Sequence, residues 1–303
     1  MKKNNLAVFL LLFMVLFLPI NIKAQTSDEI TDSEKIKEFL EIAPQEYIDL
    51  YNEGNLHLTK DNLDENGDFL PIDKVLSRYM EVNTHYVNGV AVESKSTDIT
   101  KEKYESSKQM RVVDGVQAVG NCSGVSMVND CWETNSKRLT LAVISNPSFP
   151  NVKIEVINTW KSIPSVKSYD SIGVFFNGGF NRTSANGYQY YNGSSISYSY
   201  GGTNMKLASN GVSISQDIVD STTYGLSNYL WVYGSFTSTP YQITASYQHA
   251  VNNISLATSQ NFNFSSSGMG HVFGWNTSYS NWDNMQGVCA NLSSGTSGYL
   301  WYC

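Results

Sequence analysis

Alternation of apolar and polar residues dominates the chain from residue 139 onward. Leu139, Leu141 and Val143 occupy every second position, and the same two-residue period recurs in later segments. Such a period indicates a strand with one buried face. Turn-forming clusters such as 177–179 separate the segments, so we expect about nine short strands in an antiparallel β-sandwich or a barrel-like body. The later segments are Val152/Ile154/Val156, Ile172/Val174/Phe176, Ile196/Tyr198/Tyr200, Val212/Ile214, Leu230/Val232, Ile243/Ala245/Tyr247, Ile254/Leu256 and Phe262/Phe264.

The first third of the chain has helical spacing instead. Residues 31–34 have the spacing of a capping box, and apolar residues follow at helical intervals up to residue 43. Pro44 suits the first turn of a second helix, and the apolar residues between 72 and 80 predict a third. Residues 86–91 predict a tight hairpin around an Asn-Gly turn. The pattern therefore predicts a small N-terminal helical region.

The first residues have the pattern of a secretory signal peptide. Lys2 and Lys3 precede an uncharged apolar run over 6–20, and Ala24 is a plausible cleavage position before Gln25. The run is short for a spanning helix, which needs about 20 apolar residues. We therefore predict a signal peptide over 1–24 and a secreted protein.

Charge divides the rest of the chain near residue 120. Residues 25–120 contain 20 acidic and 10 basic residues, a net charge of −10, whereas residues 121–303 contain seven of each. All six tryptophans lie in the second part. We predict an acidic, mostly helical region over 25–92, a linker over 93–120 and an antiparallel β domain over 121–303. This charge balance argues against nucleic acid as a partner, because phosphates require clustered Lys and Arg.

The acidic front has three plausible roles: a removed pro-segment, a docking domain or a spacer. Exposed polar linkers are where proteases cut, so a pro-segment would be cleaved between residues 95 and 115.

The four cysteines suit an exported protein. We predict two disulfides, Cys122–Cys131 and Cys289–Cys303, because each pair is close in sequence. A link between Cys122 and Cys303 is the alternative.

Residues 62–73 resemble the calcium loop of EF-hand proteins. Asn62, Asp64, Asn66 and Asp73 would supply oxygen ligands, and Gly67 stands where the loop turns sharply. The resemblance implies bound calcium, although Asn62 and Asp73 replace the usual first aspartate and last glutamate. The alternative is an acidic turn with no metal.

The segment before Cys122 resembles the active-site stretch of papain-like thiol proteases. Gln117 would serve the oxyanion hole, and His271 and Asn276 would complete the catalytic set. A disulfide with Cys131 would remove the reactive thiolate. The sequence therefore favours a role without catalysis, and a secreted hydrolase is the alternative.

Aromatic residues in polar, turn-like surroundings suggest a binding surface. Tyr and Trp provide rigid amphipathic contact area, and Asn and Ser provide adaptable hydrogen bonds. We therefore favour binding of an extracellular glycan, a cell-envelope component or a protein partner. The same residues would otherwise pack between strands. The candidate binding residues are Tyr188, Tyr190, Tyr191, Trp275, Tyr279, Trp282 and Trp301.

The stretch 193–220 resembles the inserting hairpins of secreted β-pore-forming toxins. It alternates apolar residues with Ser, Thr and Gly, but Lys206 and Asp217 interrupt the apolar face. A membrane-active, toxin-like protein is therefore a further alternative.

The lysine-led signal peptide and the stretch 160–170 resemble secreted proteins of Gram-positive bacteria. This resemblance implies secretion and bacterial origin. It implies no activity and no site residues.

Overall fold

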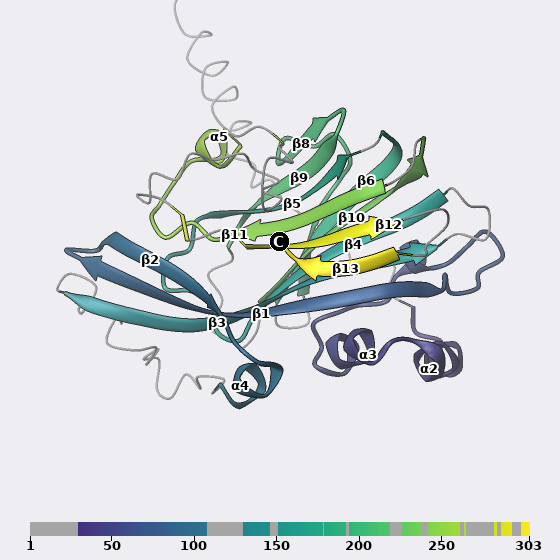
Figure 1. The fold of residues 1–303 in the computed structure, drawn as a ribbon, viewed down its shortest axis with the longest axis horizontal. Helices are drawn as coiled ribbons and strands as arrows, with labels where there is room; N and C mark the ends of the chain where they lie inside the picture. The colour runs from purple at the N-terminus through teal and green to yellow at the C-terminus, as the bar shows by residue number, and fades with distance from the viewer. Residues whose placement is uncertain are drawn as a thin grey trace, which may run out of the picture.

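The computed structural model describes residues 30–107, 130–145, 151–177, 179–191, 194–218, 226–237, 241–260, 264, 282–283, 286–292 and 298–303. They form two antiparallel β-sheets packed face to face, with short helices at the periphery (Figure 1). The predicted antiparallel β-sandwich with a small N-terminal helical region is confirmed.

Within the described residues, the larger sheet has seven strands and the smaller sheet has six. Each strand pairs with its neighbours in antiparallel register. The larger sheet has the order β2 (Val90–Asp98), β1 (Ile72–Val87), β3 (Cys131–Ser145), β4 (Asn151–Trp160), β10 (Leu226–Phe236), β6 (Phe180–Tyr191) and β7 (Ser194–Tyr198). The smaller sheet has the order β13 (Gly298–Tyr302), β12 (Gln286–Leu292), β11 (Tyr241–Gln248), β5 (Tyr169–Asn177), β9 (Gly211–Asp217) and β8 (Met205–Ala208).

The main hydrophobic core lies between the two sheets. The alternating residues Val152, Ile154 and Val156 of β4 bury completely there, as do Ile172 and Val174 of β5. Each such side chain contributes roughly 1.5–3 kcal/mol when it leaves water. The sandwich is therefore held by the inward positions that the two-residue period identifies.

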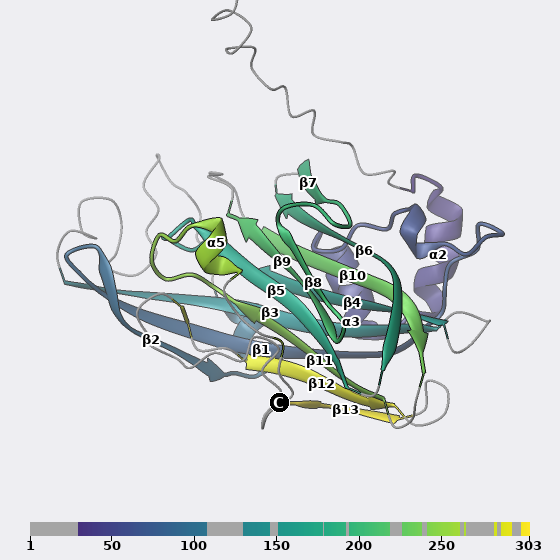
Figure 2. The ribbon, with the colours of Figure 1, turned by 90° about the horizontal axis from the view of Figure 1, so that it is seen from above.

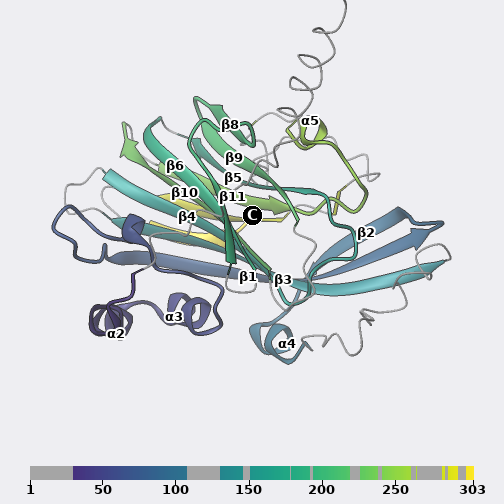
Figure 3. The same cartoon turned by 180° about the vertical axis from the view of Figure 1, so that it is seen from behind.

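A second core covers the opposite face of the larger sheet, which we call the outer face. Helices α2 (Ser33–Ile42) and α3 (Gln45–Asn52) lie against it, as Figures 2 and 3 show from two directions. Both predicted helices are present, but Asp32 caps the first by accepting two backbone N–H groups, in place of Thr31 of the predicted capping box, and Pro44 immediately precedes the second. The strands beneath them are consequently buried on both faces.

The third predicted helix is wrong, because residues 72–80 form the first half of β1. Ile72 and Val75 pack into the second core, whereas Leu76 and Met80 pack into the main core. A strand buried on both faces places apolar residues three or four positions apart, which imitates helical spacing.

The predicted linker, residues 93–120, contains regular structure: residues 93–98 belong to β2 and α4 (Lys101–Ser106) follows. The Asn-Gly hairpin is confirmed: Val87 pairs with Val90, and Asn88 and Gly89 have φ angles of 53° and 77°. This hairpin joins two strands of the larger sheet, so the sheet extends across the change in charge near residue 120.

The predicted strand at Ile254 and Leu256 is wrong as well. Helix α5 (Leu256–Ser259) begins there, and the Ser255 side chain accepts the N–H of Thr258 as its cap. Two apolar residues are too short a pattern to outweigh a good capping residue. The segment containing Phe262 lies mostly outside the described residues.

The stretch that resembles toxin hairpins contributes β7, β8 and β9 to the two sheets. Val212 and Ile214 of β9 bury completely in the main core. Insertion into a membrane would therefore require this part of the sandwich to open. Within the described ranges, no helix is both long and apolar enough to cross a membrane.

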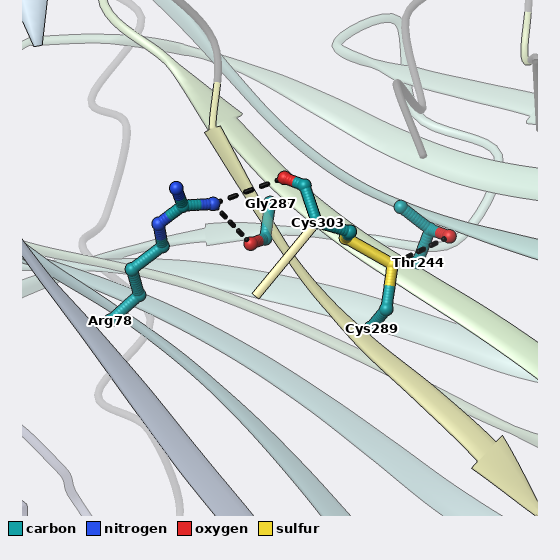
Figure 4. The surroundings of a disulfide bond; sticks show 5 residues. All are labelled: Arg78, Thr244, Gly287, Cys289 and Cys303. Carbon is teal, nitrogen blue, oxygen red and sulfur yellow. Dashed lines mark hydrogen bonds between the residues drawn. A yellow bond between two sulfur atoms is a disulfide. The ribbon is translucent and has the colours of Figure 1, made fainter. Parts of the chain in front are cut away.

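The predicted disulfide Cys289–Cys303 is confirmed and links β12 to the last residue (Figure 4). The guanidinium of Arg78 donates to the carbonyl oxygens of Gly287 and Cys303, at 2.9 and 3.0 Å. Its other nitrogens pair with Asp98. The C-terminal hairpin of the smaller sheet is thus tied to β1 of the larger sheet.

Candidate functional site

A pocket of about 520 Å³ lies between the outer face of the larger sheet and residues 60–70, which we call the pocket loop. The loop supplies one wall, and β4, β6 and β10 supply the other. The lining residues are Lys60, Asp61, Leu63, Asp64, Glu65, Asn66, Leu70, Asn151, Lys153, Ser184, Trp231 and Tyr233.

Strand register brings the sheet wall together. Tyr233 of β10 is paired with Lys153 of β4 on one side and with Ser184 of β6 on the other. Paired residues share a face of the sheet, and Trp231 shares it because it lies two positions from Tyr233. Tyr233 is half-buried, whereas Trp231 is 6% exposed, so Tyr233 offers the larger aromatic surface.

Asp64 holds the pocket loop in a tight turn. Its Oδ1 atom accepts the backbone N–H of Asn66 at 2.8 Å and that of Asp68 at 3.0 Å, and Gly67 has a φ of 81°. The N–H of Asp68, followed by that of Asn66, lowers the pKa of Asp64. Asp64 therefore stays ionised at neutral pH and can only accept hydrogen bonds.

Asp61 fastens the pocket loop to the sheet. Its Oδ2 atom accepts the indole N–H of Trp231 at 3.2 Å and the hydroxyl of Tyr188 at 3.1 Å. Its backbone carbonyl accepts Nζ of Lys153 at 2.8 Å. These three bonds join residues more than 90 positions apart, so both walls are held in place before any ligand arrives.

A buried ion pair lies on the outer face next to Asp61. Nζ of Lys153 lies 2.8 Å from Oε1 of Glu155, and these side chains are 2% and 0% exposed. Glu155 also accepts the hydroxyl of Tyr47 at 2.8 Å and Nδ2 of Asn62 at 3.1 Å. Burial, followed by the charge of Glu155, raises the pKa of Tyr47, so its hydroxyl remains a donor.

The four predicted calcium ligands have different surroundings in the structure. Asn62 directs its amide nitrogen to Glu155, Asp64 caps its own turn, Asn66 is exposed on the loop, and Asp73 lies exposed in β1. Among the described residues, no group of three or more His, Cys, Asp and Glu side chains gathers as a metal site would. Calcium binding here stays a prediction.

The five predicted binding aromatics that the structure describes differ in location and exposure. Tyr188 and Tyr190 stack on the outer face with ring centroids 5.7 Å apart, but Tyr190 is only 6% exposed. Tyr191 packs against the main core, and Trp282 is 5% exposed. Trp301 is half-buried in β13. Tyr188 contacts the pocket loop through its hydrogen bond to Asp61.

The remaining predicted aromatics, Trp275 and Tyr279, lie outside the described residues. So do all four residues of the thiol-protease hypothesis, Gln117, Cys122, His271 and Asn276. Cys131, the predicted disulfide partner of Cys122, is disulfide-bonded.

A second polar cluster lies inside the sandwich. Asp170 accepts the hydroxyl of Tyr247 and the backbone N–H of Ala250, and its Oδ1 atom lies 3.0 Å from Nδ1 of His249. Asp170 and Tyr247 are at most 1% exposed. Trp160 of β4 and Asn228 of β10 donate to the same Tyr247 hydroxyl, so this buried cluster links the two sheets within the described residues.

Two ion pairs lie in this interior, Lys137–Asp283 and His249–Asp170. Lys137 pairs with Asp283, and both side chains are at most 1% exposed. Burial alone would lower the pKa of His249, but the carboxylates of Asp170, Asp283 and Glu133 outweigh it and raise the pKa. His249 is therefore favoured in its charged form beside Asp170.

The sequence contains a pattern that identifies the sheet wall of the pocket, although the two-residue period by itself does not reveal it. Leu230 and Val232 mark one face of β10, and the intervening positions 229, 231 and 233 are all aromatic. A strand that is apolar on both faces must be covered on both faces. That reasoning identifies Trp231 and Tyr233 as residues beneath a second layer.

No protein-family model and no curated protein sequence matches this chain. Among solved structures, a collagen-binding domain from a Staphylococcus aureus adhesin is similar with a TM-score of 0.24 and 12% identity, covering 34% of this chain and 78% of that one. The collagen-binding domain of the Erysipelothrix rhusiopathiae surface protein RspB is similar with a TM-score of 0.25 and 8% identity, covering 40% of this chain and 61% of that one. These scores are too low for either likeness to bear on the function of this chain.

Proposed function

We propose that this protein is a secreted, non-catalytic binding protein that takes its ligand in the pocket between the pocket loop and the outer face. The observation that carries the proposal is a preformed cavity with aromatic, carboxylate and amide groups on facing walls. Its volume falls in the range of about 300–1,000 Å³ that is typical of ligand sites.

The chemistry of the pocket favours binding over hydrolysis. Glycoside hydrolysis by two carboxyl groups needs one that is protonated at working pH, which requires a raised pKa. The pKa of Asp64 is lowered instead. Asp61 is engaged by Trp231 and Tyr188, which fixes it as part of the wall.

Two features support an extracellular setting. The N-terminal sequence has the pattern of a signal peptide. The disulfide between Cys289 and Cys303 is typical of proteins in oxidising compartments.

The test is a binding screen of the whole secreted chain against cell-envelope preparations, glycans and extracellular matrix proteins. Ser184→Trp would place a large side chain in the pocket, and Ser199→Trp, at an exposed position outside the lining, is the matched control. We expect a ligand that binds the wild type and Ser199→Trp but not Ser184→Trp. Equal binding by all three proteins, or no ligand in the whole screen, would overturn the proposal.

A further inference from the structure

We infer that the ligand of this pocket is an uncharged saccharide, held by its hydroxyl groups along the pocket loop and by one ring face against Tyr233. This inference rests on the proposed function, because it names the ligand class of the same site. Three properties of the lining carry it: its amphipathic walls, its spare acceptors and its charges.

The walls match the two-sided character of a sugar ring. A pyranose presents C–H groups on one face and hydroxyls around its rim, so it binds where an aromatic ring and polar groups converge. Tyr233 and Trp231 provide the aromatic part of the sheet wall. Ser184 and Asn151 flank them, and Asn66 faces them from the loop, so hydroxyl and amide groups surround the rings.

The pocket loop has spare acceptors for hydroxyl donors. Asp61 uses Oδ2 for Trp231 and Tyr188, and within the described residues its Oδ1 accepts no hydrogen bond. Asp64 uses Oδ1 for two backbone N–H groups, whereas Oδ2 has only a 3.5 Å contact with Asn66. A carboxylate that uses one oxygen for hydrogen bonds within the protein is held in place, so its other oxygen is a rigid acceptor for a ligand hydroxyl. Hydrogen bonds to charged groups contribute about 1.5–3 kcal/mol.

The charges disfavour an anion. Asp61, Asp64 and Glu65 oppose Lys60 and Lys153, which leaves the lining with a net charge of 2 − 3 = −1. Lys153 is only 2% exposed and is already paired with Glu155. Among the lining residues, a phosphate, sulfate or uronate would therefore meet more carboxylates than lysines.

The same lysine disfavours a cation. Nζ of Lys153 lies 5.4 Å from the centroid of the Trp231 ring, in the geometry of a cation–π contact. A ligand ammonium close to this ring would be repelled by the charge already there. Lys153 thus already occupies the place over the Trp231 ring that a ligand ammonium would take, and hydroxyl donors match the open carboxylate oxygens without a charge of their own.

The experiment is calorimetric titration of the whole protein with trisaccharides of matched size. The uncharged probes are trisaccharides of glucose, galactose, mannose and N-acetylglucosamine; the charged probes are those of glucosamine and galacturonic acid. We expect at least one uncharged probe to bind at least about tenfold more tightly than both charged probes, a difference of about 1.4 kcal/mol. Ser184→Trp should abolish that binding, and Ser199→Trp should retain it.

Glu65→Lys provides an independent readout. Glu65 is exposed on the pocket loop, so the change alters the lining charge from −1 to +1 without disturbing the fold. The galacturonic acid probe should gain affinity relative to the uncharged probe, because the added charge attracts a carboxylate and not a hydroxyl.

The outcomes separate this inference from the proposed function. Tighter binding of a charged probe, or no saccharide binding while Ser184→Trp still blocks another ligand, would overturn the saccharide class and leave the pocket as the site. A saccharide that binds Ser184→Trp and the wild type equally would overturn both.

Discussion

Glu155→Gln removes the only carboxylate with which Lys153 pairs within the described residues. The ammonium of Lys153 is 2% exposed and lies 2.8 Å from Glu155. Breaking a buried pair leaves an uncompensated charge in a poorly solvated site, at a cost of about 3–5 kcal/mol. Tyr47 and Asn62 also donate to Glu155, so their hydrogen bonds weaken as well.

Equilibrium unfolding in urea measures this loss, and an unchanged m-value shows that the unfolded state has not changed. Glu81→Gln is the control, because Glu81 pairs with Lys103 at the surface, with 24% and 56% of the two side chains exposed. That change should cost less than about 1 kcal/mol.

The double variant Glu155→Gln/Lys153→Met removes both charges. It should be more stable than Glu155→Gln alone, because no charge remains unpaired. A Glu155→Gln protein within 1 kcal/mol of the wild type, or two changes whose costs simply add, would refute the buried-pair reasoning.

Three further predictions concern the core, the disulfide and pH. Gly187→Ala should cost about 1–3 kcal/mol in urea unfolding, because its new Cβ would lie 2.1 Å from Cδ1 of Ile214 and 2.8 Å from a backbone oxygen of β10. Replacing Cys289 and Cys303 by serine should cost about 3 kcal/mol, because the disulfide closes a span of 14 residues; a melting temperature equal to that of the wild type would contradict this. The raised pKa of His249 means that its contribution to stability is complete below its usual pKa of about 6.5 and is lost as pH rises through the folded-state pKa. The melting temperature of His249→Gln should therefore depend less on pH above about 6 than that of the wild type. If the melting temperatures of the two proteins changed with pH in parallel, His249 would not be the source of the pH dependence.

The sandwich could be predicted from sequence because its inward positions alternate strictly. Val152, Ile154 and Val156 predict a strand whatever surrounds them, and the Asn88-Gly89 turn predicts a hairpin from two residues. Both patterns are local. The alternation follows from the two-residue period of a strand, and the Asn-Gly pair provides the positive φ angles that the turn requires.

The first half of β1, which lies under the helices, could not be recognised in the same way. Ile72, Val75, Leu76 and Met80 are divided between two cores, so their spacing imitates a helix. Which element covers a strand depends on tertiary packing, and the two-residue period carries no information about it.

The candidate site could not be predicted from the sequence, for a related reason. Asp61, Lys153 and Trp231 lie far apart in sequence and meet only because β4 and β10 are neighbours. The acidic character of residues 61–68 instead suggested a metal loop, since a sequence shows the carboxylates but not the backbone N–H groups that already occupy Asp64.

The covered outer face also determines when the pocket can form during folding. Tyr47 reaches Glu155 across 108 residues of chain, and Asp61 reaches Trp231 across 170. Contacts of such high sequence separation require large loops to close and form slowly. Helices α2 and α3 are made first, yet they have no surface to cover until β4, β6 and β10 have paired. Binding competence should therefore appear late in refolding, after most of the β structure is in place.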